Sequence, residues 1–148
     1  MEFEDIKKPD IYLAFTGLGK TTYCKTHVGW IDLDEEFFLR TKTISFMPIA
    51  VKCYFQYGYK ILSNASLKTI LALRGECNLT IILPENTPEA KEFILNNVAN
   101  RGYGKKYANW LKDFYDQCYK SVLMILKPED KVIYLKAGEY ISKYLDNC

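Results

Sequence analysis

Residues 14–22 of the chain read AFTGLGKTT. This stretch follows an apolar run at residues 11–15 that predicts a β-strand, and it runs into a segment with helical spacing at residues 20–26. It matches the pattern GxxxxGK[ST] at Gly19, Lys20 and Thr21, while Ala14 stands where the pattern has its first glycine. A strand, a glycine-rich turn and a helix in this order predict a phosphate-binding loop.

The chemistry of such a loop depends on its backbone. Several N–H groups must point at one anion, and glycine permits both the φ angles and the close approach that this requires. The residues expected to hold the phosphates are Thr16, Gly17, Leu18, Gly19, Lys20, Thr21 and Thr22. The helix start adds a positive end, Lys20 can reach the β and γ phosphates, and the Thr21 hydroxyl can bind Mg²⁺. ATP and Mg²⁺ are therefore the expected cofactors.

A glycine-rich turn that binds nothing is the alternative interpretation of this stretch. Ala14 is the residue that favours it, because a methyl group at that position could shift the exit of the strand. The methyl group is tolerated if the backbone there keeps a negative φ.

The rest of the chain alternates short β-rich apolar runs with helical segments. The expected strands are residues 11–15, 30–33, 59–62, 79–83 and 131–135, and the expected helices are residues 20–26, 34–41, 48–57, 66–74, 87–100 and 105–126. This alternation predicts βαβ units and a parallel sheet covered on both faces, whose ligands bind at the carboxyl ends of the strands. Residues 1–148 are expected to form a single α/β domain.

Several residues mark where helices begin and end. Ser66 and Thr87 are predicted N-caps, with Pro88 in the first turn after Thr87, and Gly75 is predicted to stop a helix. In the long segment the apolar positions recur at steps of three and four residues, which predicts one buried stripe. Its members are Tyr107, Leu111, Phe114, Cys118, Val122 and Ile125.

Two carboxylates follow the second expected strand in WIDLDEEFF. Asp32 and Asp34 are two residues apart, so in an extended segment they share a face and can both point into the crevice beside the loop. One of them, Asp32, is expected to hold Mg²⁺ directly or through water, and Asp34 to bind the acceptor or act as a base. The alternative is that Asp34 only caps the helix that follows it.

Three arginines stand among 20 basic residues, which makes each of them informative. Arg101 lies between two helices in NVANRGYGKKY, a cationic hinge that can close over phosphates and exclude water. Arg40 is either functional or a solvated helix-end residue, and Arg74 is predicted to be solvated beside Gly75. The lone His27 is predicted to be a surface or helix-capping residue.

Composition excludes several classes. The formal net charge is +2, too weak to indicate capture by nucleic acid or an anionic membrane surface. Five scattered cysteines without a CxxC pair, together with one histidine, signal neither a disulfide framework nor a zinc site. The acidic N-terminus and the lack of an apolar run of about 20 residues predict no signal peptide and no membrane span. A reducing cytoplasm is expected.

Taken together, AFTGLGKTT, IDLDEEFF, ANRGYG and the final KVIYLKAGEYISKYL resemble the short phage-type nucleotide kinases of the adenylate-kinase-like P-loop superfamily. The resemblance covers nearly the whole chain, and its phosphate-loop part is the most specific. It implies a three-layer α/β/α P-loop NTPase fold with a five-stranded parallel sheet in the order 2-3-1-4-5. It also implies a small helical lid at about residues 98–108.

The resemblance further implies a nucleoside or deoxynucleoside monophosphate kinase that transfers the γ-phosphate of ATP. Lys20 and Thr21 match the loop lysine and the Mg²⁺ ligand, Arg40 falls where such kinases bind the acceptor phosphate, and Arg101 matches the lid arginine. The third strand departs from the family, because Leu62 is followed by Ser63 and Asn64 with no acid.

Three alternatives to this function remain open. The first is a P-loop kinase that acts on a hydroxyl of a small molecule or of a polynucleotide 5′ end, with Asp34 as the base and Arg40 a spectator. The second is a non-catalytic nucleotide-binding protein that contacts another protein, and the third is a phage protein with a vestigial loop that blocks a host factor. Tyr103, Tyr107 and Trp110 could stack on a base near the lid or belong to the core, and a homodimer is left open.

Overall fold

The computed structural model describes residues 7–34, 44–101 and 105–147. It contains one all-parallel five-stranded sheet in the order β2-β3-β1-β4-β5, as predicted. The strands are β1 (Asp10–Ala14), β2 (Trp30–Asp32), β3 (Lys60–Asn64), β4 (Asn78–Pro84) and β5 (Lys131–Leu135). The described helices are α1 (Lys20–Thr26), η2 (Ile44–Phe46), α2 (Met47–Gln56), α3 (Leu67–Leu73), α4 (Pro88–Asn100), α5 (Lys105–Ile125) and α6 (Ser142–Leu145).

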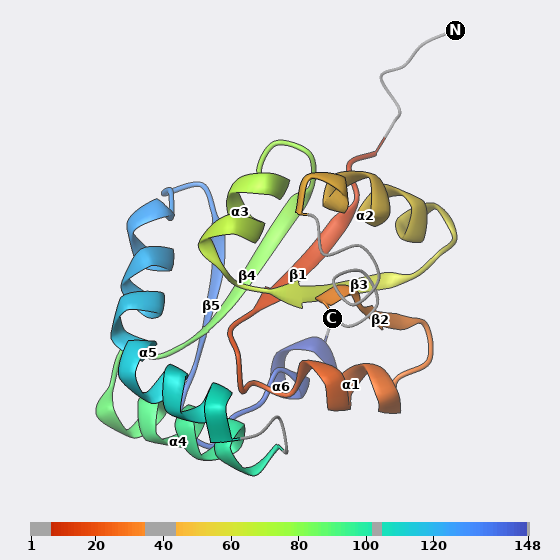
Figure 1. Ribbon diagram of the computed structural model, residues 1–148. Helices are drawn as coiled ribbons and strands as arrows, with labels where there is room; N and C mark the ends of the chain where they lie inside the picture. The colour runs from red at the N-terminus through yellow and green to blue at the C-terminus, as the bar shows by residue number, and fades with distance from the viewer. Residues whose placement is uncertain (1–6, 35–43, 102–104, 148) are drawn as a thin grey trace, which may run out of the picture.

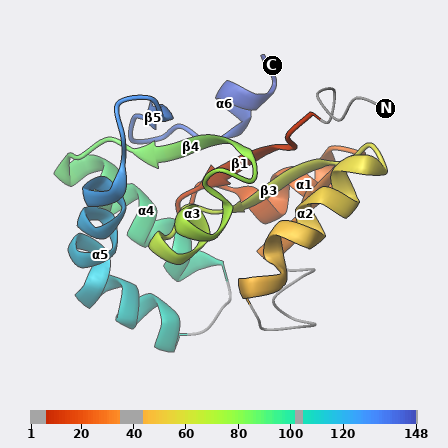
Figure 2. The same ribbon diagram turned by 90° about the horizontal axis from the view of Figure 1, so that it is seen from above.

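Helices lie on both faces of this sheet. Figure 2 shows α3 and α5 on one side of β1 and β4 and α6 on the other. On the α6 side, α1 joins the same layer, since the Tyr23 hydroxyl of α1 donates a hydrogen bond to Asp146, just after α6, at 2.8 Å. The chain is therefore an α/β protein in which the sheet is covered twice.

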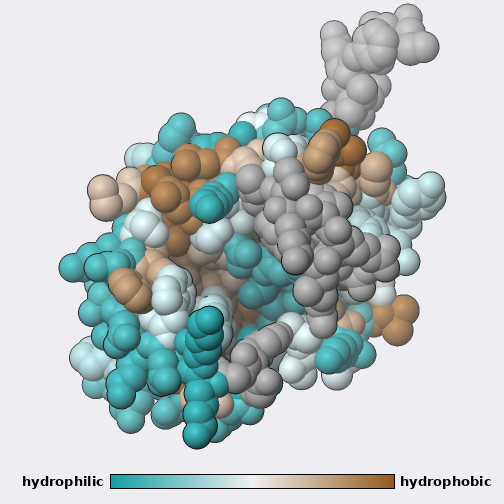
Figure 3. Space-filling model, in the orientation of Figure 1, coloured by the Kyte–Doolittle hydropathy of each residue, from teal (hydrophilic) through white to brown (hydrophobic). Residues whose placement is uncertain are grey.

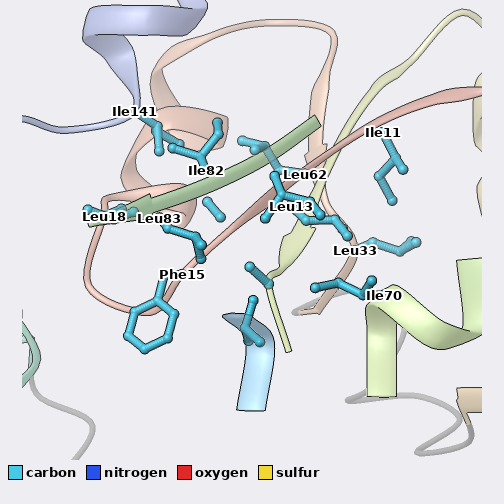
Figure 4. Packing of buried hydrophobic residues seen from close by; sticks show 14 of the residues in the cluster. Ile11, Leu13, Phe15, Leu18, Leu33, Leu62, Ile70, Ile82, Leu83 and Ile141 are labelled. Atoms are coloured by element: carbon cyan, nitrogen blue, oxygen red, sulfur yellow. The ribbon is translucent and has the colours of Figure 1, made fainter. Parts of the chain in front are cut away.

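The core follows from this double coverage. Parallel strands that are buried on both faces need continuous apolar runs rather than alternating ones. In β4 the residues Ile81, Ile82 and Leu83 are all fully buried. Leu18 and Ile141 belong to the same buried cluster (Figure 4), so the segment after β1 and the start of α6 are packed into the core.

The predicted helix signals are confirmed where the structure describes them. The Ser66 hydroxyl accepts the backbone N–H of Thr69 at the start of α3, and the Thr87 hydroxyl accepts that of Ala90 at the start of α4. His27 is the C-cap of α1 and contacts the Tyr23 carbonyl through Nδ1 at 2.9 Å. The predicted helix at residues 34–41 lies outside the described residues, apart from Asp34.

The predicted buried stripe of α5 is confirmed at Leu111 and Val122 and is wrong at Tyr107 and Phe114. The buried residues are Leu111, Tyr115, Tyr119 and Val122, whereas Tyr107 and Phe114 are 38% and 39% exposed. Tyr115 and Tyr119 pack edge-on against Phe15 of the segment after β1. Tyrosine can fill a core position when its apolar ring is buried, so the steps of three and four did not separate two possible faces.

Arg74 is not solvated, contrary to the prediction. Its side chain is 20% exposed and donates to Asp130 at 2.5 Å and to the Ile125 carbonyl at 2.9 Å. The arginine therefore ties the end of α3 to the end of α5 and to the turn before β5, a set of contacts that joins distant parts of the chain.

Apolar and hydrophilic side chains are unevenly distributed over the surface. Exposed apolar side chains include Leu67 and Leu71 on α3 and Met124 on α5, and Figure 3 shows apolar surface over this part of the molecule. Hydrophilic surface occupies most of the lower half of the same view, toward which the carboxyl ends of the strands run in Figure 1. Among the described helices, none has both the length and the apolar character needed to cross a membrane.

Candidate functional site

The predicted phosphate loop leaves the sheet at the carboxyl end of β1. Ala14 is the last strand residue, fully buried, and the Phe15 N–H donates to the Ile82 carbonyl at 2.9 Å. Gly17 has φ +81°, Gly19 has φ +94°, and α1 begins at the next residue. Because side chains disfavour this left-handed region, both glycines stand where the backbone requires them.

Two other parts of the chain, α4 and the segment before α6, hold the loop in place. Asn97 of α4 donates its amide to the Gly17 carbonyl at 3.0 Å, and the Ile141 N–H donates to the Leu18 carbonyl at 3.1 Å. A Cβ on Gly17 would lie 3.0 Å from Cγ2 of Ile94 and 3.2 Å from its carbonyl oxygen. The loop therefore packs directly on α4, and its shape is not set by its own residues alone.

Lys20 is unusually enclosed for a lysine. It is only 8% exposed, and its Nζ lies 3.7 Å from Oδ2 of Asp34. Lysine is almost never buried in this way unless it is paired. A cation is thus fixed at the first residue of α1, beside the loop.

Asp32 contacts the residue that follows this lysine. It is the last residue of β2 and 6% exposed, and its Oδ2 accepts a hydrogen bond from the Thr21 hydroxyl at 3.1 Å. Burial raises the pKa of Asp32, and the nearby charge of Asp34 acts in the same direction, while Lys20 and the Thr21 hydroxyl oppose the rise. Asp32 and Thr21, the two predicted metal ligands, are therefore in direct contact.

Asp34 is held from the neighbouring strand. Its Oδ1 accepts hydrogen bonds from the Ser63 hydroxyl at 2.7 Å and from the Asn64 amide at 3.0 Å. Asn64 in turn accepts the Thr69 hydroxyl at 2.7 Å. Capping is thus not the sole role of Asp34, because its side chain links β3 to Lys20. In the sequence, Ser63 and Asn64 stood out only because neither is an acid. The signal that could have identified them as site residues is their position at the carboxyl end of a strand.

Arg101 reaches the same place from α4. It is the C-cap of that helix, and its Nη2 donates to the Thr21 hydroxyl at 3.1 Å. The predicted lid arginine therefore lies beside the predicted metal ligand. Of the lid region, residues 98–101 end α4 and residues 105–108 begin α5, while residues 102–104 lie outside the described parts of the chain. Arg40 lies outside them as well.

A cavity of about 470 Å³ opens on one side of the loop. Its walls come from Gly17 and Gly19, from α1, from Asn97 and Arg101 of α4, and from Tyr140 before α6. The Tyr140 hydroxyl donates to Oδ1 of Asn97 at 3.2 Å, and its ring packs on Phe93 at 5.2 Å. The volume falls in the range of small-molecule sites. Tyr140 and Asn97 were not predicted. The only sequence signal for Tyr140 is the glycine-containing turn after the last strand, and Asn97 is one of several polar residues in a helix.

The donor set determines which metal fits. Among the described residues, no group of three His, Cys, Asp or Glu side chains could form a metal site by itself. Thr21 and Asp32 offer one hydroxyl and one carboxylate 3.1 Å apart. Mg²⁺ commonly takes one or two protein oxygens and completes its shell with water and substrate phosphates. These two residues therefore fit a Mg²⁺ ion shared with a polyphosphate.

This geometry defines a class: an α/β protein whose glycine loop, buried lysine and Thr–Asp pair meet at the carboxyl edge of a parallel sheet. Comparison with models of known protein families finds no match, and comparison with curated proteins finds none either. What the site does has to be inferred from its own chemistry.

Proposed function

We propose that the chain is an ATP-dependent phosphotransferase, with a nucleoside monophosphate as its acceptor. The observation that carries this proposal is the position of the Thr21 hydroxyl, which contacts Asp32 at 3.1 Å and Arg101 at 3.1 Å next to the buried Lys20. Two cations and a metal-binding pair around one glycine loop are what a transferring phosphoryl group needs.

In this proposal ATP lies partly in the cavity and partly over the glycine loop. The nucleoside occupies the cavity lined by Tyr140 and Asn97, and the phosphates run over residues 16–22 toward Lys20. The loop N–H groups and Lys20 bind the phosphate oxygens. Thr21 and Asp32 would hold Mg²⁺, which would neutralise phosphate charge when bound.

The residues of the chain stabilise the transfer by position and charge. In phosphoryl transfer the charge spreads over the oxygens of the migrating group, so placed cations lower the barrier more than any covalent step. Lys20 and Arg101 supply this charge from two elements, α1 and α4. Arg101, at the end of α4, also covers the phosphates and limits hydrolysis by water.

The acceptor is assigned to the side of Asp34. A monophosphate is already anionic and needs no general base, so Asp34 orients the sugar or bound water, and Arg40 clamps the acceptor phosphate. Asp34 suits an orienting role because Ser63 and Asn64 fix its Oδ1 while Oδ2 faces Lys20.

The experiment is transfer of labelled γ-phosphate from ATP to two panels of acceptors. One panel contains nucleoside and deoxynucleoside monophosphates, and the other contains small alcohols, sugars and 5′-hydroxyl oligonucleotides. Labelled diphosphate from the first panel alone is the expected result. Transfer to hydroxyls alone would refute the monophosphate acceptor.

A hydroxyl acceptor is the second candidate because Asp34 is a positioned carboxylate with 23% of its side chain exposed. Such a group can take a hydroxyl proton as the phosphoryl group arrives. Asp34→Asn separates the two candidates. It abolishes transfer to a hydroxyl and leaves most of the transfer to a monophosphate.

A further inference from the structure

Helix α5 has two unlike flanks beside its buried face. Ala108, Asn109 and Lys112 line a groove against α4. Because each helical residue turns by about 100°, Tyr107, Trp110 and Phe114 fall on the flank that faces away from α4. We call these three residues the aromatic stripe.

The aromatic stripe is exposed and continuous. The exposed fractions of the residues Tyr107, Trp110 and Phe114 are 38%, 47% and 39%. Tyr107 and Trp110 lie 6.1 Å apart at 20°, and Trp110 and Phe114 lie 5.4 Å apart at 35°. Large apolar groups gathered on the surface of a soluble domain commonly mark a place where something binds.

One end of the stripe touches the predicted phosphate loop. The hydroxyl groups of Tyr107 and Thr16 are 3.1 Å apart and hydrogen-bonded. The stripe therefore begins at the loop and runs about two helical turns away from it. Lys106, also exposed, precedes Trp110 by four residues and adds a positive charge to the same flank.

The stripe and the cavity lie on different sides of α4. Tyr140 of the cavity packs on Phe93 of α4, while the stripe faces away from that helix. In an in-line transfer the migrating phosphoryl group lies between the donor and the acceptor. With the donor nucleoside in the cavity, the stripe is a separate aromatic surface that begins at the loop and that the base of an acceptor can reach.

We propose that the aromatic stripe binds the nucleobase of the acceptor by stacking, with Trp110 as its centre. This inference rests on the proposed function and names the acceptor as a phosphate ester that carries a flat aromatic base. Stacking tolerates every base, because each has a π face, so the enzyme accepts several nucleoside monophosphates rather than one.

The test compares acceptors with and without a base. The probes are AMP, GMP, dCMP and dTMP against ribose 5-phosphate, titrated by calorimetry into the full chain with Mg²⁺ and a non-hydrolysable ATP analogue. Trp110→Ala is expected to weaken binding of the four monophosphates by about 10-fold to 100-fold, as loss of one stacked base does. Ribose 5-phosphate should bind weakly to both proteins and respond little to the change.

Tyr57→Ala is the matched control. Tyr57 is an exposed aromatic residue, 83% exposed, but it lies before β3 at the amino end of the strands. Its removal should leave all affinities unchanged. Binding of the ATP analogue alone should be equal within about two-fold in all three proteins, which shows that each is folded.

A second readout uses the fluorescence of Trp110. In a Trp30→Phe background Trp110 is the sole tryptophan, because the sequence contains two. Monophosphates should quench it and ribose 5-phosphate should not.

The inference is overturned if Trp110→Ala binds the monophosphates as the parent does, if ribose 5-phosphate binds as tightly as they do, or if none of them binds. Absence of binding by the ATP analogue is a separate failure, because it contradicts the proposed function itself.

Discussion

Folding and the proposed metal binding favour different protonation states of the Asp32 carboxyl group. It is 6% exposed at the end of β2, and burial raises its pKa. An ionised group in such a place works against folding, yet the ionised form is the one that binds Mg²⁺. Protein sites commonly retain a costly group of this kind when a ligand needs it.

Asp32→Asn is expected to stabilise the protein without ligand at about pH 7, because the amide removes the ionised group that folding disfavours. The Thr21 hydroxyl can accept a hydrogen bond from the amide in place of donating one. The gain should vanish at about pH 3, below the ordinary carboxyl value of 3.8, since the acid is then protonated in both states. Thermal unfolding at the two pH values measures this gain in stability.

The Asp32→Asn variant should also lose the stabilisation that Mg²⁺ and ATP confer. If the variant is less stable than the parent at neutral pH, the ionised Asp32 does not work against folding.

Arg101 is expected to act on the rate more than on binding. Arg101→Ala should lower the rate of phosphoryl transfer by at least about 100-fold, because an arginine at the transferring group stabilises charge that develops in the transition state. Affinity for the ATP analogue should change by less than about 10-fold. Lys120→Ala, which removes an exposed cation of α5 outside the lid region, is the control and should leave the rate unchanged. Equal rates for Arg101→Ala and the parent would remove Arg101 from the mechanism.

At the scale of elements, local signals predicted local structure. The strands and caps could be found because Ser66 and Thr87 carry their own hydrogen-bonding groups, and because buried parallel strands such as β4 are continuously apolar. The face of α5 could not be found in the same way. Its buried face and its exposed aromatic stripe both carry aromatic rings, and only packing against Phe15 decides which rings are buried.

The packing of Gly17 against α4 can be tested by adding a methyl group at Gly17. Gly17→Ala and Gly58→Ala place the same methyl group at φ +81° and φ +87°, so backbone strain alone should cost each about 1 kcal/mol or slightly more in unfolding free energy. Only at Gly17 does the new Cβ meet α4, at 3.0 Å from Ile94, whereas Gly58 has nothing within 4 Å. Gly17→Ala alone should therefore also abolish binding of the ATP analogue. Calorimetry and chemical denaturation of both variants measure the two effects, and equal nucleotide affinities would show that the loop tolerates the displacement.

At the scale of the whole molecule, the order of the strands in the sheet brings residues that are distant in the sequence into contact. The order β2-β3-β1-β4-β5 places β1 and β3 side by side, which brings Ser63 and Asn64 next to the loop after β1. The sequence predicted the loop, both aspartates and Arg101, because each has a motif or a position at a strand or helix end. It did not predict Tyr140, Asn97, Ser63 or Asn64, whose contacts join segments 29 to 80 residues apart, from Asp34–Ser63 to Gly17–Asn97. Such contacts exist only after the sheet has formed.

The most direct test of the central claim is calorimetric titration of the parent, Lys20→Ala and Lys25→Ala with Mg²⁺ and a non-hydrolysable ATP analogue. Both lysines are in α1, but Lys20 is buried beside the loop and Lys25 is exposed in the last turn. The parent and Lys25→Ala should bind one equivalent with the same affinity, and Lys20→Ala should bind at least about 10-fold more weakly, as expected for loss of a charged hydrogen bond. A flat titration of the parent, or equal binding by Lys20→Ala, would contradict a phosphate-binding role for residues 15–21.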